Sequence, residues 1–132
     1  MEAVKQYRVK GKLAEAESRV RDALKAQGFG ILTEVDVQAT LKTKLGIDTS
    51  PYKILGACNP PIAHRALEAD PSVGAFLPCG VALKESADGA ETIVFLQNPR
   101  AISEVFANPA LKEPGEQAAS ALEAALSSVA ES

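Results

Sequence analysis

Along this chain the spacing of apolar residues alternates between the two-residue period of a strand and the 3.6-residue period of a helix. Strand periodicity is found in residues 4–9, 29–35, 52–58, 73–84 and 91–96. Helical periodicity is found in residues 13–27, 37–45, 59–69, 98–106 and 116–130. In chain order these segments predict the succession β-α-β-α-β-α-β-β-α-α, which is typical of helices layered on a sheet.

The two consecutive strands within residues 73–96 break the strict alternation of strand and helix. A hairpin there favours an α+β fold over a doubly wound one, so we expect helices packed on a mixed, mainly antiparallel sheet of about five strands. Pro78 interrupts its strand and predicts an edge or a bulge, because proline cannot donate to a neighbouring strand. We find no repeat or linker in the 132 residues, so the chain is predicted to be a single domain, residues 1–132.

The last predicted strand has apolar residues on both of its faces. Ile93 and Phe95 share one face, and Val94 and Leu96 share the other. Helices that cover only one side of the sheet would leave the second apolar face exposed to water. A second copy of the chain is the simplest cover, so we expect a homodimer.

Composition and charge exclude several classes of function. The net charge of −3 and the pI of about 5.2 argue against a basic nucleic-acid-binding surface. The sequence contains no run of about 18 apolar residues, the length that a membrane span needs. Residues 1–12 are too charged for a signal peptide. We therefore expect a cytoplasmic protein in which Cys58 and Cys79 are free thiols, unless adjacent strands bring them close enough to pair.

The segment CNPPIAH, residues 58–64, concentrates the chemistry-bearing residues. If a helix begins after Asn59, its positive N-terminus would lower the pKa of the Cys58 thiol, and His64 would lie one turn further on as a base. However, asparagine followed by proline is also ordinary helix-capping sequence. The same pair recurs at residues 98–99 and 108–109. Both interpretations, a reactive thiol and a simple helix start, remain open.

Three further side chains are candidates for the same site. Cys79 shares a strand face with Val81, as a core residue or as a side chain turned toward a site by a bulge. Asp36 is expected to cap the helix of residues 37–45. Glu34 is either a semi-buried carboxylate with a raised pKa or a solvated residue at a strand end. These residues lack the short paired spacing of a metal site, so we predict none.

The chain resembles the prokaryotic family known as domain of unknown function 302 in three segments, GFGILTEVDVQATLKTKLGI, PYKILGACNPPIAHRAL and DPSVGAFLPCGVAL. The resemblance runs from about residue 4 to residue 129, nearly the whole chain. It implies a small α+β domain that is often dimeric, and it implies no particular reaction. Gly80 departs from the family's usual LPCN, which puts in doubt any polar site that would use that asparagine.

Two functions follow from these observations. The first is a homodimeric binding or interaction module with a pocket where the third strand meets its helix, because strand ends and helix N-termini converge there. The backbone amides of residues 59–62 would suit a small anionic ligand. The expected ligand-binding residues are Glu34, Asp36, Cys58, Asn59 and Cys79.

The second function is a thiol-dependent enzyme or redox protein. Its catalytic residues would be Cys58 and either His64 as the base or Cys79 as the resolving thiol. The sequence assigns no cofactor to either function.

Overall fold

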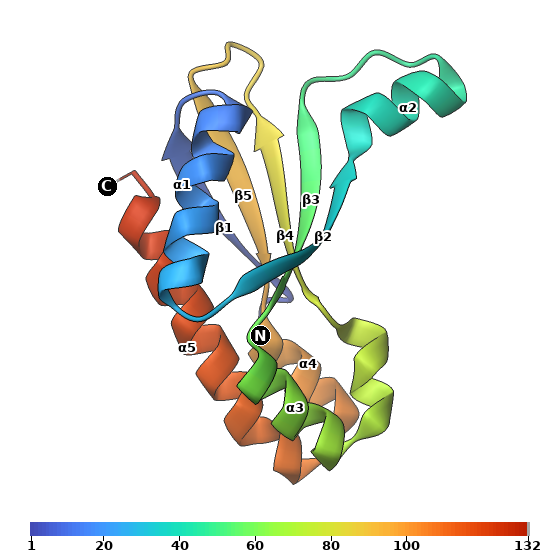
Figure 1. Cartoon of the computed structure of the whole chain (residues 1–132), viewed down its shortest axis with the longest axis vertical. Helices are drawn as coiled ribbons and strands as arrows, with labels where there is room; N and C mark the ends of the chain where they lie inside the picture. Colours follow the sequence, from blue (N-terminus) through green and yellow to red (C-terminus); the bar gives the residue numbers. More distant parts are fainter. Residues whose placement is uncertain (132) are drawn as a thin grey trace.

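A five-stranded sheet in the order β1-β5-β4-β3-β2 runs through the computed structural model (Figure 1). The strands are β1 (Val4–Lys10), β2 (Gly30–Asp36), β3 (Tyr52–Cys58), β4 (Cys79–Glu85) and β5 (Glu91–Gln97). All four neighbouring pairs are antiparallel. The structure describes residues 1–131. The predicted α+β class and five-stranded sheet are confirmed, and the sheet is entirely antiparallel.

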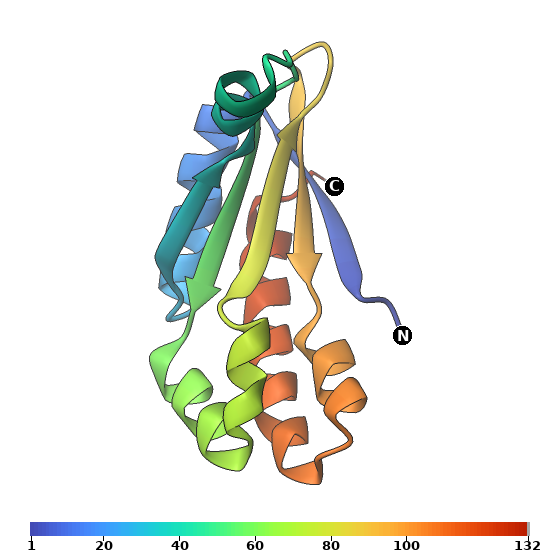
Figure 2. The same cartoon turned by 90° about the vertical axis from the view of Figure 1, so that its right-hand side faces the viewer.

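Helices cover one face of this sheet and close its lower end. Residues 1–131 contain the α-helices α1 (Leu13–Ala26), α2 (Val37–Leu45), α3 (Pro60–Ala69), α4 (Pro99–Phe106) and α5 (Lys112–Val129). Two 3₁₀ helices, η1 (Pro71–Phe76) and η2 (Pro109–Leu111), join them. α1 and the upper part of α5 lie behind the sheet in Figure 2, and α3, η1 and α4 lie below it. Among the helices of residues 1–131, none combines the length and the apolar character of a membrane-spanning segment.

The core lies between the sheet and the helices α1 and α5. α1 turns one stripe toward it, because its buried residues recur every three to four positions: Leu13, Ala16, Val20 and Leu24. β4 and β5 bury alternate residues on the same side, as the two-residue period requires. The core side chains of these two strands include Val81, Leu83, Val94 and Leu96. Val94 and Leu96, which the sequence places on one face of β5, thus face the core.

The segment before β4 differs from its prediction as a strand. Residues 71–76 form η1, and β4 begins only at Cys79. Pro71 occupies the start of η1, and the Asp70 carboxylate accepts a hydrogen bond from Ser72 N at 3.0 Å. Such capping chemistry favours a helical turn, whereas the apolar spacing of Val73 and its neighbours resembles that of a strand. The last helix also begins earlier than expected, at Lys112.

A bulge in β2 changes which side chains face the helices. The pairing with β3 shifts between Ile31 and Thr33, so Leu32 falls at the irregular position and is 66% exposed. Ile31, just before the bulge, packs against the core opposite Ala57, and Glu34, after the bulge, lies opposite buried Leu55. The extra residue in the bulge is unpaired, which explains its exposure.

On the other face of the sheet, the only helix of residues 1–131 in Figure 2 is α2, in front of the upper ends of the strands, and the middle and lower parts of this face are uncovered. A row of apolar side chains crosses four neighbouring strands on this open face, because Val35 pairs with Ile54, Ile54 with Ala82 and Ala82 with Phe95. Val35 is 45% exposed and Ile54 is 39% exposed. Both faces of β5 are therefore apolar, as expected from the sequence.

Candidate functional site

The turn from β3 into α3 is built by Asn59, which caps the helix. Its Oδ1 accepts a hydrogen bond from Ile62 N at 3.3 Å, and Pro60 and Pro61 form the first helical positions. The predicted helix start is confirmed. The amide donors expected there are missing, because proline has no N–H and the N–H of Ile62 is already bound by the cap. This helix terminus is therefore poorly suited to hold an anion through its backbone.

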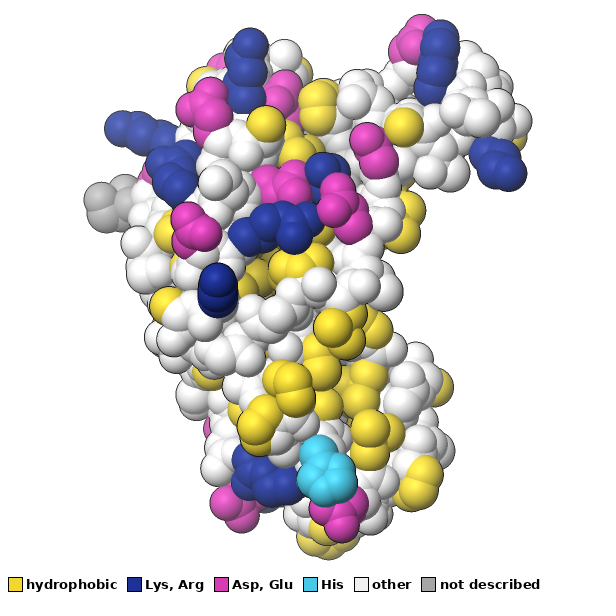
Figure 3. All heavy atoms as spheres, viewed as in Figure 1, with side chains coloured by type: hydrophobic (Ala, Val, Ile, Leu, Met, Phe, Trp, Pro, Cys, Tyr) yellow, Lys and Arg dark blue, Asp and Glu magenta, His cyan; other side chains and the backbone are white. Residues whose placement is uncertain are grey.

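An apolar cavity opens beside this turn, between the lower end of the sheet and the helices α3, η1, α4 and α5. We call it the lower cavity, and its wall includes Ile62, Ala66, Phe76, Ile102, Leu111 and Ala118. Its volume is about 70 Å³, and about 610 Å³ when the open space at its mouth is included. Figure 3 shows hydrophobic side chains gathered on the surface above His64, over the part of the molecule that contains α3.

The polar side chains in the wall of the lower cavity already have partners. Gln97 Oε1 accepts from Gly80 N at 2.8 Å. Ser103 Oγ lies 3.0 Å from Pro99 O and 3.1 Å from Leu111 O. None of the residues that line this cavity carries a charge. The wall therefore offers apolar contact and the two thiols, and little electrostatic attraction for an ion.

Cys58 and Cys79 both line the lower cavity as free thiols. They lie near each other because Ala57, the neighbour of Cys58, is directly opposite Cys79 in the sheet. Burial raises the pKa of the half-buried Cys58 thiol. Burial, and then the nearby Cys58, raise the pKa of Cys79 to about 11. Of the two interpretations left open, the one that lowers the Cys58 pKa is wrong, because desolvation disfavours the thiolate and the prolines remove the helix donors.

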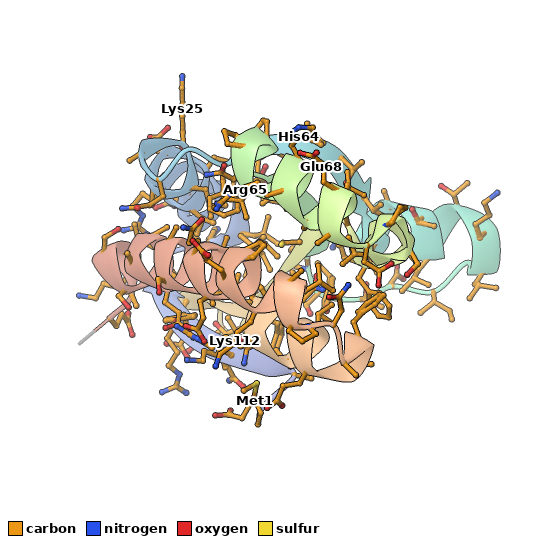
Figure 4. All side chains as sticks on the ribbon, turned by 90° about the horizontal axis from the view of Figure 1, so that it is seen from below. Met1, Lys25, His64, Arg65, Glu68 and Lys112 are labelled. Atoms are coloured by element: carbon orange, nitrogen blue, oxygen red, sulfur yellow. The ribbon has the colours of Figure 1, made fainter. Side chains whose placement is uncertain are left out.

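His64 is on the solvent side of α3 and faces away from the thiols. Its Nε2 lies 2.9 Å from Glu68 Oε1, and its side chain is 74% exposed. Figure 4, viewed from below, shows the two residues side by side on the outside of the helix. His64 does not line the lower cavity. The structure therefore does not bring together the predicted pair of Cys58 and a histidine base.

Glu34 and Asp36 lie toward the opposite end of the sheet from Cys58. β2 is antiparallel to β3, so Glu34 pairs with Leu55 and Asp36 pairs with Lys53. Leu55 and Lys53 precede Cys58 by three and five residues, which corresponds to roughly 10 and 17 Å along a strand. The prediction that Glu34 and Asp36 share a pocket with Cys58 is wrong. It requires β2 and β3 to end at the same edge of the sheet, whereas these strands run in opposite directions.

Each of these carboxylates has a structural partner of its own. Asp36 Oδ1 accepts from Ala39 N at 2.9 Å, so its predicted role as a helix cap is confirmed. Glu34 lies 2.8 Å from Lys53 Nζ and 2.8 Å from Arg21 Nη2. The hydrogen bond from Lys53 is the main cause that lowers the pKa of Glu34, opposite to the raised pKa of a semi-buried acid. Within residues 1–131, no three His, Cys, Asp or Glu side chains gather as a metal site would require.

The sequence interpretation missed most of the apolar wall of the lower cavity. Ile62 and Ala66 of α3 are four residues apart, and Pro99 and Ile102 of α4 are three apart, which is the spacing of one apolar face. That signal was present in the sequence. Neither helix, however, buries a side chain completely, so the same spacing also describes ordinary packing.

Comparisons with known proteins add the following findings. The model of a family described as domain of unknown function DUF302 matches residues 5–129. A crystal structure of an uncharacterized conserved protein DUF302 from Bacillus stearothermophilus is 30% identical in sequence, with a TM-score of 0.89. The match covers 98% of this chain and 99% of that one. No curated protein matches the chain.

Proposed function

Because the chain belongs to the family of domain of unknown function DUF302, whose description names no activity, we propose a function from the lower cavity: a homodimeric module that binds a compact, uncharged, mainly apolar small molecule. The family match extends over residues 5–129, so it includes every element that forms the cavity. The cavity supports a binding module, and the proposed ligand class follows from the cavity wall.

The observation that carries this proposal is the chemistry of that wall. Its residues are apolar or neutral, and Gln97, Ser103 and Asn59 already make hydrogen bonds within the protein. A buried anion would find no opposite charge there, and an unpaired buried charge is very costly. Ligand sites in proteins are commonly concave, mostly apolar and supplied with few polar groups, which matches this wall. An uncharged ligand therefore fits better than the anion expected from the sequence.

The size of the lower cavity supports a compact ligand. Its volume of about 70 Å³ is smaller than the ~150 Å³ apolar cavities that hold benzene. A single ring would therefore occupy the cavity together with part of its mouth, which adds space up to about 610 Å³. Phe76 at the mouth packs edge to face against Phe106, with ring centroids 5.5 Å apart. These rings provide an apolar rim against which an aromatic ligand can pack.

The homodimer is proposed on the basis of the open face of the sheet. Its row of Val35, Ile54, Ala82 and Phe95 crosses four strands and lies on the side opposite α1 and α5. Contiguous apolar surface of this kind commonly marks an interface, and a symmetric pair of chains covers both copies at once.

One observation supports the alternative of thiol chemistry, namely that Cys58 and Cys79 line the same cavity. Two others disfavour it. Burial raises the pKa of both thiols, and His64 is paired with Glu68. We therefore assign the thiols to the apolar wall, where cysteine acts as a small hydrophobic residue.

A titration of methyl-labelled protein with toluene tests the proposal, with benzoate as the anionic probe of similar shape. We expect toluene to shift the methyl resonances of Ile62 and Ile102 in a saturable manner, and benzoate to shift them at least tenfold more weakly. Ala66→Leu, which fills the cavity from α3, should weaken toluene binding at least tenfold. Ala14→Leu, which adds the same atoms to an exposed site on α1, should leave it unchanged. Equal binding of the two probes, or no effect of Ala66→Leu, would contradict the proposal.

A further inference from the structure

Helix α2 stands out from the body of the molecule on the side of the open sheet face. Figure 1 shows it projecting to the right at the top, and Figure 2 shows it in front of the upper ends of the strands. Its nine residues include none that is buried. Nevertheless it carries apolar residues spaced by four, Val37, Leu41 and Leu45, and Ile47 follows directly after the helix. Leu45 is 65% exposed and Ile47 is 47% exposed.

The ends of α2 are well formed, but its apolar residues have little to pack against. Asp36 caps the first turn, and Gly46 ends the helix in a left-handed conformation with a φ of 67°. Isolated helices shorter than ~12–15 residues are marginal in water, so most of their stability comes from packing an apolar face. Within residues 1–131 this helix has only partial contact of that kind. A second surface is needed to bury Leu45 and Ile47.

The open sheet face is a second unburied apolar surface, next to α2. Figure 3 shows the molecule hollowed between α2 at the upper right and the lower helices, and Figure 2 shows the open sheet on that side. The row that begins with Val35 and Ile54 crosses this face. We call this region the indentation, and it is bounded by α2 above and by α3 and η1 below.

We propose that a second copy of the chain occupies the indentation, and that α2 of each copy lies across the open sheet face of the other. This inference rests on the proposed homodimer and specifies its interface. A two-fold contact repeats every interaction, so one arrangement buries Leu45 and Ile47 of both copies against Ile54 and Phe95 of both copies. One chain thus carries both apolar surfaces of the contact, α2 and the open sheet face. This favours a second copy over an unrelated partner.

The area available is close to what a stable dimer needs. Five strands of seven residues each make a face of about 24 by 23 Å, or roughly 550 Å². The nine residues of α2 add a strip about 14 Å long and ~10 Å wide, or roughly 140 Å². A standard interface buries ~800 Å² per partner. The sheet face and the helix together offer roughly 690 Å² per copy, which lies within the range of standard interfaces and requires most of the sheet face to be covered.

Sedimentation equilibrium over a wide range of protein concentration tests this interface. We expect the wild-type chain to be a dimer. Leu45→Asp on α2 and Ile54→Glu on the sheet face should each raise the dimer dissociation constant at least 100-fold. The control Val105→Asp, at a 75% exposed apolar residue on α4 outside the indentation, should change it less than twofold. Leu45 is not part of the core, so its variant should keep the far-UV circular dichroism of the wild type.

Two outcomes would overturn the inference, and they differ in what they leave standing. If Ile54→Glu dissociates the dimer and Leu45→Asp does not, α2 is not part of the interface, although the proposed homodimer survives. If the wild-type chain is monomeric at every concentration, both the interface and the proposed homodimer fail. The toluene titration of the lower cavity is independent of both results, so a failure of ligand binding is recognised separately.

Discussion

Gly56 and Gly80 lie directly opposite each other on β3 and β4, yet only one of them has room for a side chain. A Cβ atom on Gly56 would overlap Thr33 Oγ1 and Pro78 Cγ. A Cβ atom on Gly80 would meet only Gln97 Oε1, at an ordinary contact distance of 3.7 Å. Gly56 therefore allows Pro78, just before β4, and Thr33 of β2 to close over β3. The lower ends of β2, β3 and β4 form the top of the lower cavity.

This difference predicts opposite results for two alanine substitutions. Gly56→Ala should lower the free energy of unfolding by roughly 1–3 kcal/mol, because overpacking forces the neighbours apart. Gly80→Ala should change the free energy of unfolding by less than about 0.5 kcal/mol. Urea denaturation of both variants measures the two values, and equal losses would contradict the packing described here.

The buried Cys79 thiol should make the protein less stable in alkaline solution. Its pKa in the folded protein is about 11, whereas an unfolded thiol ionises near pH 8.5–9. Above that pH the unfolded chain holds fewer protons, so the free energy of unfolding falls as the pH rises toward 11. The loss for this group should reach roughly 2–3 kcal/mol. The variant Cys79→Ala should show a correspondingly shallower decline between pH 9 and 11 in denaturant titrations, and an unchanged slope would contradict the burial of this thiol.

Cys58 should react with iodoacetamide as a poorly ionised thiol. Burial raises its pKa, so its alkylation should be very slow at pH 6 and should keep increasing with pH beyond the range in which the rate of an ordinary thiol levels off. His64→Ala should leave the rate constant unchanged within twofold, because His64 contacts Glu68 on the solvent side of α3. Peptide mass spectrometry separates the labelling of Cys58 from that of Cys79. Rapid labelling of Cys58 at pH 6, lost in His64→Ala, would instead support the thiol enzyme.

Lys53 should control the ionisation of Glu34. The two side chains are 2.8 Å apart, and the hydrogen bond from Lys53 is the largest cause of the lowered Glu34 pKa. A lowered pKa stabilises the fold above the ordinary carboxyl pKa, and this contribution is lost as the pH falls through the lowered value. In Lys53→Gln, NMR titration of the Glu34 carboxyl should give a pKa closer to the ordinary value. Lys42→Gln, which removes the ion pair between Lys42 of α2 and Asp48, should leave the pKa of Glu34 unchanged.

Much of the fold could be predicted because the local signals agree with one another. The stripe of Leu13, Ala16, Val20 and Leu24 is apolar, helical in spacing and followed by Gly28, and the structure buries it. Asn59 was correctly predicted as a cap, because asparagine is a preferred N-cap residue and proline is a preferred first residue of a helix. Residues 73–76 were wrongly predicted to be part of a strand. Pro71 and the Asp70 cap favour a 3₁₀ helix there, although the apolar spacing resembles that of a strand.

The candidate site was less predictable because it depends on strand order and on side-chain direction. The sequence alone does not reveal that β2 runs antiparallel to β3. This pairing places Asp36 opposite Lys53, and so away from Cys58 at the other end of β3. The sequence placed His64 one turn from Asn59, but the helix turns that position toward solvent. The presence of Cys58 and Cys79 in one cavity was predicted as a possibility of adjacent strands, and the register of Ala57 with Cys79 explains it.

The location of an uncharged ligand tests the central claim most directly. Crystals grown with 4-bromotoluene would reveal the bromine by its anomalous scattering. The account predicts one bromine in the lower cavity, between Ile62 of α3 and Ile102 of α4. Bromine bound only on the open sheet face, or no bound bromine at a saturating concentration, would contradict it.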